Sequence, residues 1–176
     1  MTTWVALLRG INVGGHKKVP MADLRTMCVG LWPDSAPKTY IASGNLIFSA
    51  KGDAAEIRTA LEEGIASTFG FDVPVCLVAG EALQMTTNTC PFPDAEGKAV
   101  HAFMPIDGSL PAEVELNKFK TVDEVIEYAG EMVWLYTPSG FQKSKLGERL
   151  SSAKGPYRLT VRNLNSMRKL SQMLDS

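Results

Sequence analysis

Residues 38–50 read KTYIASGNLIFSA, and this stretch contains two strand-like runs joined by a turn with a glycine. The runs cover residues 38–42 and 46–50, and the connection between them is Ser43-Gly44-Asn45. Two such runs separated by three residues that include glycine are typical of a β-hairpin. The stretch therefore predicts an antiparallel pair of strands in the first half of the chain.

The segments on either side of the hairpin each add a strand and a helix. Residues 3–9 form a short apolar run typical of a buried strand, and a helix is expected over residues 20–32 because Pro20 suits a first helical turn. After the hairpin, Asp53 is a good helix N-cap and Gly70 ends that helix, which residues 73–79 follow as another strand. The first 79 residues thus have the order β-α-β-β-α-β.

The second half repeats this order and adds helices to it. Strands are expected at residues 99–106, 124–128, 132–136 and 158–162, and helices at 81–86, 111–119, 142–153 and after Asn163. The predicted fold class is α+β, with two consecutive ferredoxin-like (α-β plait, βαββαβ) subdomains. The subdomains are expected to cover residues 1–79 and 80–176, with an additional short helix and a C-terminal helix in the second.

Composition and charge are those of an ordinary globular protein. The 176 residues are 45% hydrophobic and 21% charged, with a net charge of -1, which gives no general attraction to nucleic acids or anionic membranes. The charge is uneven, because residues 79–140 have three basic and ten acidic side chains, whereas residues 141–176 have eight basic and two acidic ones. The simplest interpretation is solvated helix faces that attract each other within the fold.

Cysteine usage and the apolar runs indicate a cytoplasmic protein. The chain has three cysteines and no CxxC pair, a pattern typical of a reducing compartment. The apolar run at residues 4–8 is too short for a signal peptide, and no stretch is long enough to span a membrane, so no membrane partner is expected. No His/Cys/Asp cluster has metal-ligand spacing, and we expect neither a metal nor a cofactor.

The most unusual segment is the glycine-rich loop, residues 10–18, between the first strand and the first helix. Glycines allow the backbone to approach a ligand closely, and the loop ends at a helix N-terminus, which favours anions. We expect contacts to a phosphate- or carboxylate-bearing small molecule, or to a nucleic acid, from Arg9, Gly10, Asn12, Gly14, Gly15, Lys17 and Lys18. The loop matches neither a P-loop nor GxGxxG, and the alternative is a crossover that needs glycine only for its own turns.

The hairpin turn supplies two further candidate ligand contacts, Ser43 and Asn45. In an ideal split βαβ sheet we expect this turn at the opposite end from the glycine-rich loop. A serine triad is not indicated, because His16 and His101 are the only histidines and a hairpin is not the strand–helix corner of a nucleophile elbow. No catalytic residue is assigned.

The last candidates are Arg162 and Asn163, which precede the final helix. One interpretation is that Asn163 or Asn165 caps this helix. The other is that Arg162, with Arg149, Arg158 and Arg168, binds an anion beside the helix N-terminus.

Split βαβ sheets also bind RNA through aromatic side chains on their first and third strands. The corresponding strands have Trp4 and Phe48 as isolated aromatics. We expect these two residues in the core or an interface rather than in a stacking platform.

Several segments together resemble a bacterial family, domain of unknown function family 1697. They read LRGINVGG (residues 8–15) with KVPM (18–21), TYIASGN (39–45), KSKL (143–146) and TVRNLNS (160–166). Leu164 stands where the family often has tryptophan, and His16 occupies a variable position. The resemblance implies two α-β plait subdomains and no established activity, and it carries over no catalytic residue.

Three functions remain open from the sequence. The first is binding of an anionic ligand at the glycine-rich loop. The second is a non-catalytic module that assembles through its sheet edges or faces, and the third is an enzyme that uses Ser43 or His16. The oligomeric state is not predicted.

Overall fold

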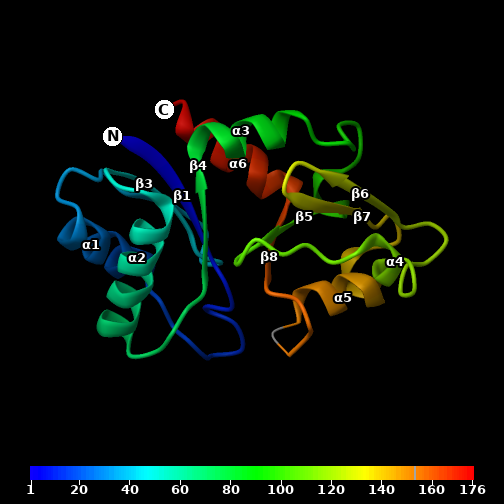
Figure 1. Ribbon diagram of the computed structural model, residues 1–176, viewed down its shortest axis with the longest axis horizontal. Helices are drawn as coiled ribbons and strands as arrows, with labels where there is room; N and C mark the ends of the chain where they lie inside the picture. Colours follow the sequence, from blue (N-terminus) through cyan, green and yellow to red (C-terminus); the bar gives the residue numbers. More distant parts are fainter. Residues whose placement is uncertain (153) are drawn as a thin grey trace. The chain divides into compact units, whose positions relative to one another are not determined.

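The structure is a computed structural model that describes residues 1–152 and 154–176 (Figure 1). In this described part the chain is mixed α+β, with six α-helices and two four-stranded antiparallel sheets. It divides into two compact units, Met1–Leu83 with Leu170–Ser176, and Gln84–Lys169. Each unit contains one of the sheets.

The first unit has a sheet of order β2-β3-β1-β4 with two helices on one face (Figure 1). Its elements are β1 (Thr2–Leu8), α1 (Met21–Leu31), β2 (Lys38–Tyr40), β3 (Asn45–Ala50), α2 (Ala54–Phe69) and β4 (Val75–Ala79). Alternate β1 residues, Trp4, Ala6 and Leu8, point into a core with Leu24 of α1 and Leu61 of α2. Burying an aliphatic side chain of this size stabilises a fold by about 1.5–3 kcal/mol, so this apolar layer holds the unit together.

Local sequence signals fix the ends of α2. The Asp53 carboxylate accepts hydrogen bonds from the backbone N–H groups of Ala55 and Glu56, both at 2.9 Å. At the other end Gly70 has φ 83°, and its N–H donates to Ala66 O at 2.9 Å. Both predicted caps are confirmed.

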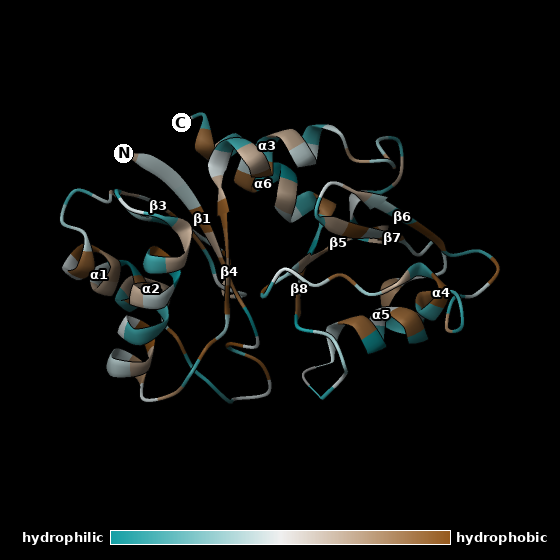
Figure 2. Ribbon diagram, in the orientation of Figure 1, coloured by the Kyte–Doolittle hydropathy of each residue, from teal (hydrophilic) through white to brown (hydrophobic). Residues whose placement is uncertain are grey.

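The second unit has a sheet of order β6-β7-β5-β8. Its strands are β5 (Val100–Pro105), β6 (Val125–Ala129), β7 (Met132–Tyr136) and β8 (Leu159–Asn163). The helices of the remaining chain are α3 (Gly80–Asn88), α4 (Glu113–Leu116), α5 (Lys145–Ser151) and α6 (Leu164–Leu174), with 3-10 turns at Gly97–Ala99 and Phe141–Lys143. Phe103 and Leu135 of the sheet form a core with Leu116 of α4 and with Leu146 and Leu150 of α5. Figure 2 shows hydrophilic and hydrophobic residues alternating along α5, as expected for a helix with one buried face.

Three elements differ from the sequence prediction. The helix expected at residues 111–119 is only the four-residue α4, Glu113–Leu116. The strand expected at residues 38–42 ends at Tyr40, because Ile41 has φ 49° and begins a turn. The helix expected at residues 142–153 is a 3-10 turn followed by α5, because Ser144 is extended (φ -81°, ψ 113°) and its hydroxyl caps α5 by accepting from Gly147 N at 2.9 Å. Residue 153, the end of that prediction, lies outside the described part.

The predicted aromatic arrangement in the first sheet is confirmed. Trp4 and Phe48 are paired across β1 and β3 and are both buried, in the same core as the helices. Trp32 stacks on Phe48 with the ring centroids 5.1 Å apart. These aromatics therefore belong to the core and do not form a surface on which bases could stack.

In the part of the chain that the structure describes, every helix falls short of the length and apolar character that crossing a membrane requires. Within the same residues no group of three or more His, Cys, Asp or Glu side chains is placed to hold a metal ion. Cys28, Cys76 and Cys90 are not in disulfides, and all three are buried.

Candidate functional site

The glycine-rich loop and the hairpin turn lie side by side at one end of the first sheet. Strand β1 runs antiparallel to β3, with Leu7 opposite Asn45, and Leu8 N donates to Gly44 O at 2.8 Å. The expectation that the two segments occupy opposite ends is wrong, because antiparallel pairing brings the end of β1 to the start of β3. We call residues 10–18 and 41–44 together the loop platform.

Asn12 joins the two halves of the loop platform. Its Nδ2 donates to Val19 O at 3.0 Å and to Ala42 O at 2.7 Å, and its Oδ1 accepts from Val19 N at 2.8 Å. Asn12 has φ 54°, a conformation that asparagine tolerates better than most residues. Both amide donors are used within the protein, so a ligand can reach only a lone pair of Oδ1.

The hairpin turn is packed tightly against the loop. Gly44 has φ 89°, and a Cβ at this position would lie 2.7 Å from Ile11 Cδ1 and 2.8 Å from Leu8 Cβ. Asn45 is fully buried, and its Nδ2 donates to Tyr40 O at 2.8 Å and to Ser43 Oγ at 3.1 Å. Ser43 and Asn45, predicted as ligand contacts, are thus tied into the turn itself.

The stem of the loop is also held by internal hydrogen bonds. Lys17 has φ 48°, its backbone O accepts from Asn12 N at 3.1 Å, and its Nζ donates to Asp72 O at 2.7 Å. Arg9 N donates to Pro74 O at 3.0 Å, which anchors the start of the loop to the chain before β4. Ile11 and Val19 are buried in the unit's core. The loop is therefore fixed at both of its ends.

The backbone of the loop platform has an unusual density of left-handed conformations. Positive φ occurs at Gly10, Asn12, Gly14, Gly15, Lys17, Ile41 and Gly44. A β-branched residue rarely adopts such a φ, yet Ile41 does so with half of its side chain exposed. Residues in these regions persist only where the surrounding structure determines them, and they concentrate at functional sites.

The tip of the loop presents backbone and cationic groups to solvent. Gly14, Gly15, His16 and Lys18 are exposed. Among the described residues Lys18 has no hydrogen bond or ion pair, in contrast to Lys17. The site offers exposed N–H groups and a lysine, which suit binding of an anion.

Arg162 and Asn163 lie in the other unit and have partners there. The Arg162 side chain is buried, and its Nη1 donates to Val161 O at 2.7 Å and to Thr160 Oγ1 at 3.1 Å. Asn163 Oδ1 accepts from Ser166 N at 2.8 Å, the bond expected of a helix N-cap. The prediction that Asn163 caps the final helix is confirmed.

Two features of the second unit were missed from the sequence. His101 is buried in β5, where its ring stacks on Phe141 with the centroids 3.8 Å apart, and burial lowers the pKa of His101 to about 4. The other is a hollow beside α5 in which Phe119 accompanies Arg149. The recurrence of Lys145, Arg149 and Ser152 at helical spacing was the available signal for it.

The protein is mixed α+β, with two antiparallel sheets and helices that cover them. Two loops joined by hydrogen bonds form a rigid surface at the end of one sheet. The chain belongs to the family described as protein of unknown function DUF1697, whose model matches residues 1–134. The resemblance noted in the sequence is thereby confirmed, and the matched range contains the whole loop platform.

The structure is similar to the solved structure of a conserved bacterial protein from Streptococcus pneumoniae. The TM-score is 0.80 at 24% sequence identity, and the alignment covers 100% of this chain and 99% of that chain. At this identity the likeness concerns the fold alone. No curated protein matches the chain.

Proposed function

We propose that this protein binds an anionic small molecule, with a phosphate or carboxylate group, at the loop platform of its first unit. The observation that carries the proposal is Ile41, an exposed β-branched residue at φ 49°. Left-handed backbone costs such a residue about 1–2 kcal/mol, whereas glycine or asparagine would adopt it with less strain. Backbone strain at an exposed position, in a loop that hydrogen bonds hold in place, is consistent with a binding surface.

The anion would contact the tip of the loop rather than its stem. Gly14 and Gly15 are exposed with φ 60° and 76°, and a Cβ on Gly15 would meet no atom within 4 Å apart from its chain neighbours. Their N–H groups and the Lys18 ammonium can converge on a ligand oxygen. The first turn of α1 lies beyond Pro20 and contains Asp23. The Asp23 carboxylate interacts with the positive end of the helix dipole and so competes with a ligand anion at that position. We therefore assign the main contacts to Gly14, Gly15 and Lys18, with Arg9, Gly10, Asn12, Lys17, Ser43 and Asn45 shaping the loops behind them.

A small molecule is favoured over a nucleic acid. Trp4 and Phe48 are buried against the helices, so the first sheet lacks the aromatic platform that single-stranded RNA requires. The net charge of -1 also gives no long-range attraction to a polyanion.

A second candidate is a protein-interaction module. Val13 is 67% exposed and Ile41 is 50% exposed, so each half of the loop platform has one exposed aliphatic side chain. Exposed aliphatic residues that form a contiguous patch indicate contact with an apolar surface. In the ligand-binding account the same two side chains contact an apolar part of the small molecule.

Two further proposals concern context. Each sheet with its helices is a ferredoxin-like subdomain, one over residues 1–79 and the other over 80–176, a proposal supported by the βαββαβ order and by the strand orders β2-β3-β1-β4 and β6-β7-β5-β8. The compact units differ from these bounds, since the first also contains residues 80–83 and Leu170–Ser176. The protein acts in the cytoplasm, as three free buried cysteines favour a reducing compartment.

The test is a thermal-shift panel on the full chain with inorganic phosphate, citrate, adenosine 5′-monophosphate, glucose 6-phosphate and a short single-stranded RNA. A ligand at 100 times its Kd adds about 2.7 kcal/mol of stability, which raises the Tm by about 5–10 °C for a chain of this size. The Lys18→Ala variant should lose about half of this shift, because a tenfold weaker affinity lowers the added stability to about 1.4 kcal/mol.

Lys51→Ala is the matched control, because Lys51 is an exposed lysine at the opposite end of β3 and should leave the shift unchanged. The proposal fails if no anion raises the Tm or if Lys18→Ala responds like the unmodified chain. A shift with RNA alone would favour nucleic acid binding instead.

A further inference from the structure

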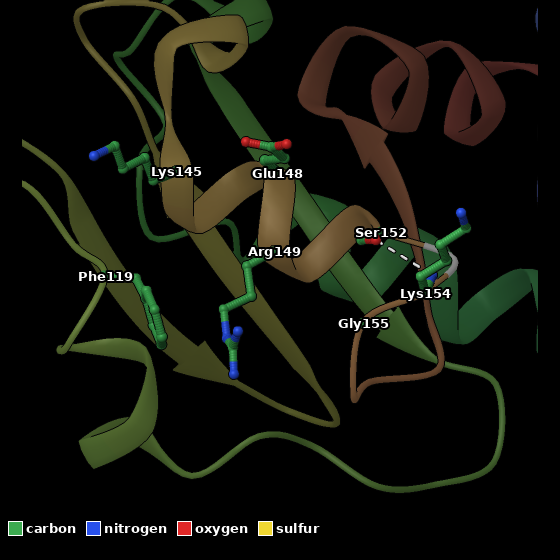
Figure 3. A pocket seen from close by; sticks show the side chains of 7 residues that line it. All are labelled: Phe119, Lys145, Glu148, Arg149, Ser152, Lys154 and Gly155. Carbon is green, nitrogen blue, oxygen red and sulfur yellow. Dashed lines mark hydrogen bonds between the residues drawn. The ribbon is translucent and has the colours of Figure 1, made fainter.

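The second unit contains a hollow of about 390 Å³ beside α5 (Figure 3). A volume of this order is in the range of small-molecule sites. The hollow is lined by Phe119, Lys145, Glu148, Arg149, Ser152, Lys154 and Gly155. It combines an aromatic ring, a guanidinium and two ammonium groups.

Arg149 is the centre of this group. Its guanidinium carbon lies 4.2 Å from the centroid of the Phe119 ring, and Figure 3 shows the two side chains next to each other. The Arg149 Nε is buried, and in the described part of the chain it has no hydrogen-bond partner. The Tyr157 hydroxyl oxygen accepts a hydrogen bond from the Arg149 side chain, while the hydroxyl donates its own hydrogen to Glu115 Oε2 at 3.1 Å. This uses one of the five N–H donors of Arg149 and leaves the others for a ligand. Stacking on the ring orients the planar guanidinium, which leaves its edge for a bidentate anion.

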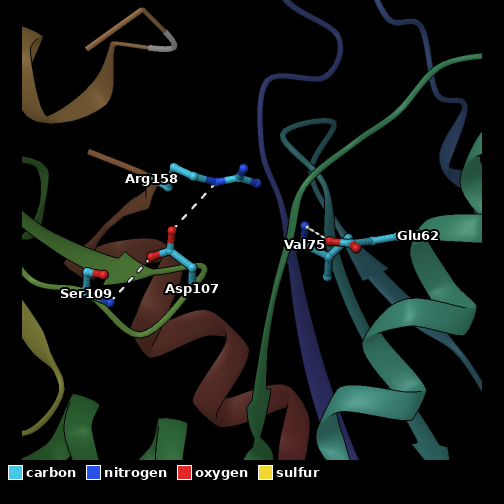
Figure 4. A network of polar contacts seen from close by, with 5 residues as sticks. All are labelled: Glu62, Val75, Asp107, Ser109 and Arg158. Atoms are coloured by element: carbon cyan, nitrogen blue, oxygen red, sulfur yellow. Dashed lines mark hydrogen bonds and ion pairs between the residues drawn. The ribbon is translucent and has the colours of Figure 1, made fainter. Parts of the chain in front are cut away.

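The other arginines of this region are already engaged. Arg158 Nε pairs with Asp107 Oδ2 at 3.9 Å, as Figure 4 shows, and Arg168 Nη2 donates to Pro93 O at 3.0 Å. Within residues 1–152 and 154–176, Arg149 makes no ion pair with a carboxylate. Its neighbours Lys145 and Lys154 likewise have no carboxylate partner among the described residues.

The charge of the hollow selects the kind of anion. Lys145, Arg149 and Lys154 are opposed by the single carboxylate of Glu148, so the lining has a net charge of +2 at neutral pH. A phosphomonoester carries a charge of about -1.5 to -2 at this pH and has three acceptor oxygens, whereas a carboxylate carries only -1. The charge of a phosphomonoester therefore balances the +2 of the lining, and its three oxygens accept hydrogen bonds from the cationic side chains.

We infer that the hollow between Phe119 and α5 is a binding site for the phosphate ester of a small organic molecule, with Arg149 as the bidentate anchor. Lys145 and Lys154 line the hollow on either side of Arg149 and add positive charge at longer range (Figure 3). The Phe119 ring holds Arg149 in place and offers an apolar wall to the organic part of the ligand. This site is separate from the loop platform and uses none of its residues.

Isothermal titration calorimetry of the full chain tests this site, in a Lys18→Ala background that weakens binding at the loop platform about tenfold. The probes are adenosine 5′-monophosphate and glucose 6-phosphate, with adenosine and glucose as their unphosphorylated partners and citrate as a carboxylate. We expect a phosphate ester to bind, its unphosphorylated partner not to bind, and Arg149→Gln to weaken the affinity at least tenfold. Phe119→Leu should weaken it about three- to tenfold, because the stacking that orients the guanidinium is lost.

Arg158→Gln is the control, since it removes an exposed arginine of the same unit and should change the affinity less than twofold. If Arg149→Gln does not fold, Arg149→Lys keeps the charge but loses the planar fork, and should still weaken binding several-fold. The inference is overturned if no phosphate ester binds, if citrate alone binds, or if the Arg149 variants bind as well as the parent.

Discussion

Asn12 Nδ2 donates a hydrogen bond to Ala42 O at 2.7 Å and so joins two loops that lie 30 residues apart in the sequence. The same amide group donates to Val19 O and accepts from Val19 N, which closes the glycine-rich loop on itself. One asparagine side chain therefore holds three backbone groups in place. The rigidity of the loop platform depends on this residue.

Replacing Asn12 with alanine should destabilise the first unit by about 2–4 kcal/mol. Three hydrogen bonds of about 1 kcal/mol each are lost, and alanine tolerates φ 54° less well than asparagine does. Urea unfolding followed by circular dichroism measures the change. Asn12→Gly removes the bonds without the conformational penalty and should cost about 1 kcal/mol less; a loss below 0.5 kcal/mol for Asn12→Ala would show that the hydrogen bonds carry little of the stability.

Gly44→Ala should destabilise the protein more than Gly15→Ala. A Cβ on Gly44 meets Ile11 and Leu8 at 2.7 and 2.8 Å, so overpacking adds about 1–3 kcal/mol to the penalty of positive φ. Gly15 has positive φ but open space around it, and only the conformational penalty of about 1–2 kcal/mol applies. Equal Tm values for the two variants would contradict the close contact between the turn and the loop.

Ile41→Asn should stabilise the fold by about 0.5–1 kcal/mol, because asparagine accepts φ 49° with less strain. If Ile41 contacts a ligand, the same variant should also bind that ligand more weakly. Measuring the Tm and the ligand-induced shift on one sample separates the two effects. A variant that is less stable than the parent would contradict the assignment of strain to this position.

Stability should rise with pH between about pH 4 and 6.5 because of His101. Burial lowers the pKa of His101 to about 4 in the folded protein, from 6.5 in the unfolded chain. Between these pH values the His101 imidazole is protonated in the unfolded chain and neutral in the folded protein. The free energy of unfolding is therefore highest above pH 6.5 and decreases as the pH falls toward 4. The expected contribution is about 1–3 kcal/mol.

His101→Phe provides the control for this pH dependence, because phenylalanine fits beside Phe141 and does not titrate. Urea unfolding gives the free energy of unfolding at pH 4.5 and at pH 7. The difference between these two values should be smaller by about 1–3 kcal/mol in this variant than in the parent protein. The same pH dependence in both proteins would show that other groups cause it.

The sequence was most informative where local chemistry decides the structure. Asp53 and Gly70 end α2 as predicted, since an N-cap and a left-handed C-cap depend only on neighbouring backbone groups. Ile41 was predicted in a strand because isoleucine favours extended backbone. It adopts φ 49° in a turn whose next residue, Ala42, is hydrogen-bonded to Asn12 of a distant loop. The stack of Arg149 on Phe119 was missed for the same reason, as it joins residues from separate elements.

The loop platform was recognised in the sequence, but its geometry was not. The glycines and lysines of residues 10–18 indicated a candidate site, whereas the neighbouring turn was expected elsewhere. Antiparallel pairing of Leu7 with Asn45 brings the two together. As a consequence Asn12, Ser43 and Asn45 hold the loops, and Lys18 is the candidate that faces solvent without a partner in the described part.

Binding at the loop platform is tested most directly by the ¹⁵N-¹H spectrum of the full chain during titration with inorganic phosphate and adenosine 5′-monophosphate. We predict saturable shifts of the backbone amides of Gly14, Gly15 and Lys18, with an affinity that Lys18→Ala weakens about tenfold and Lys51→Ala leaves unchanged. Saturating ligand that leaves these three amides unmoved would contradict the proposed binding function, whatever the hollow beside α5 binds.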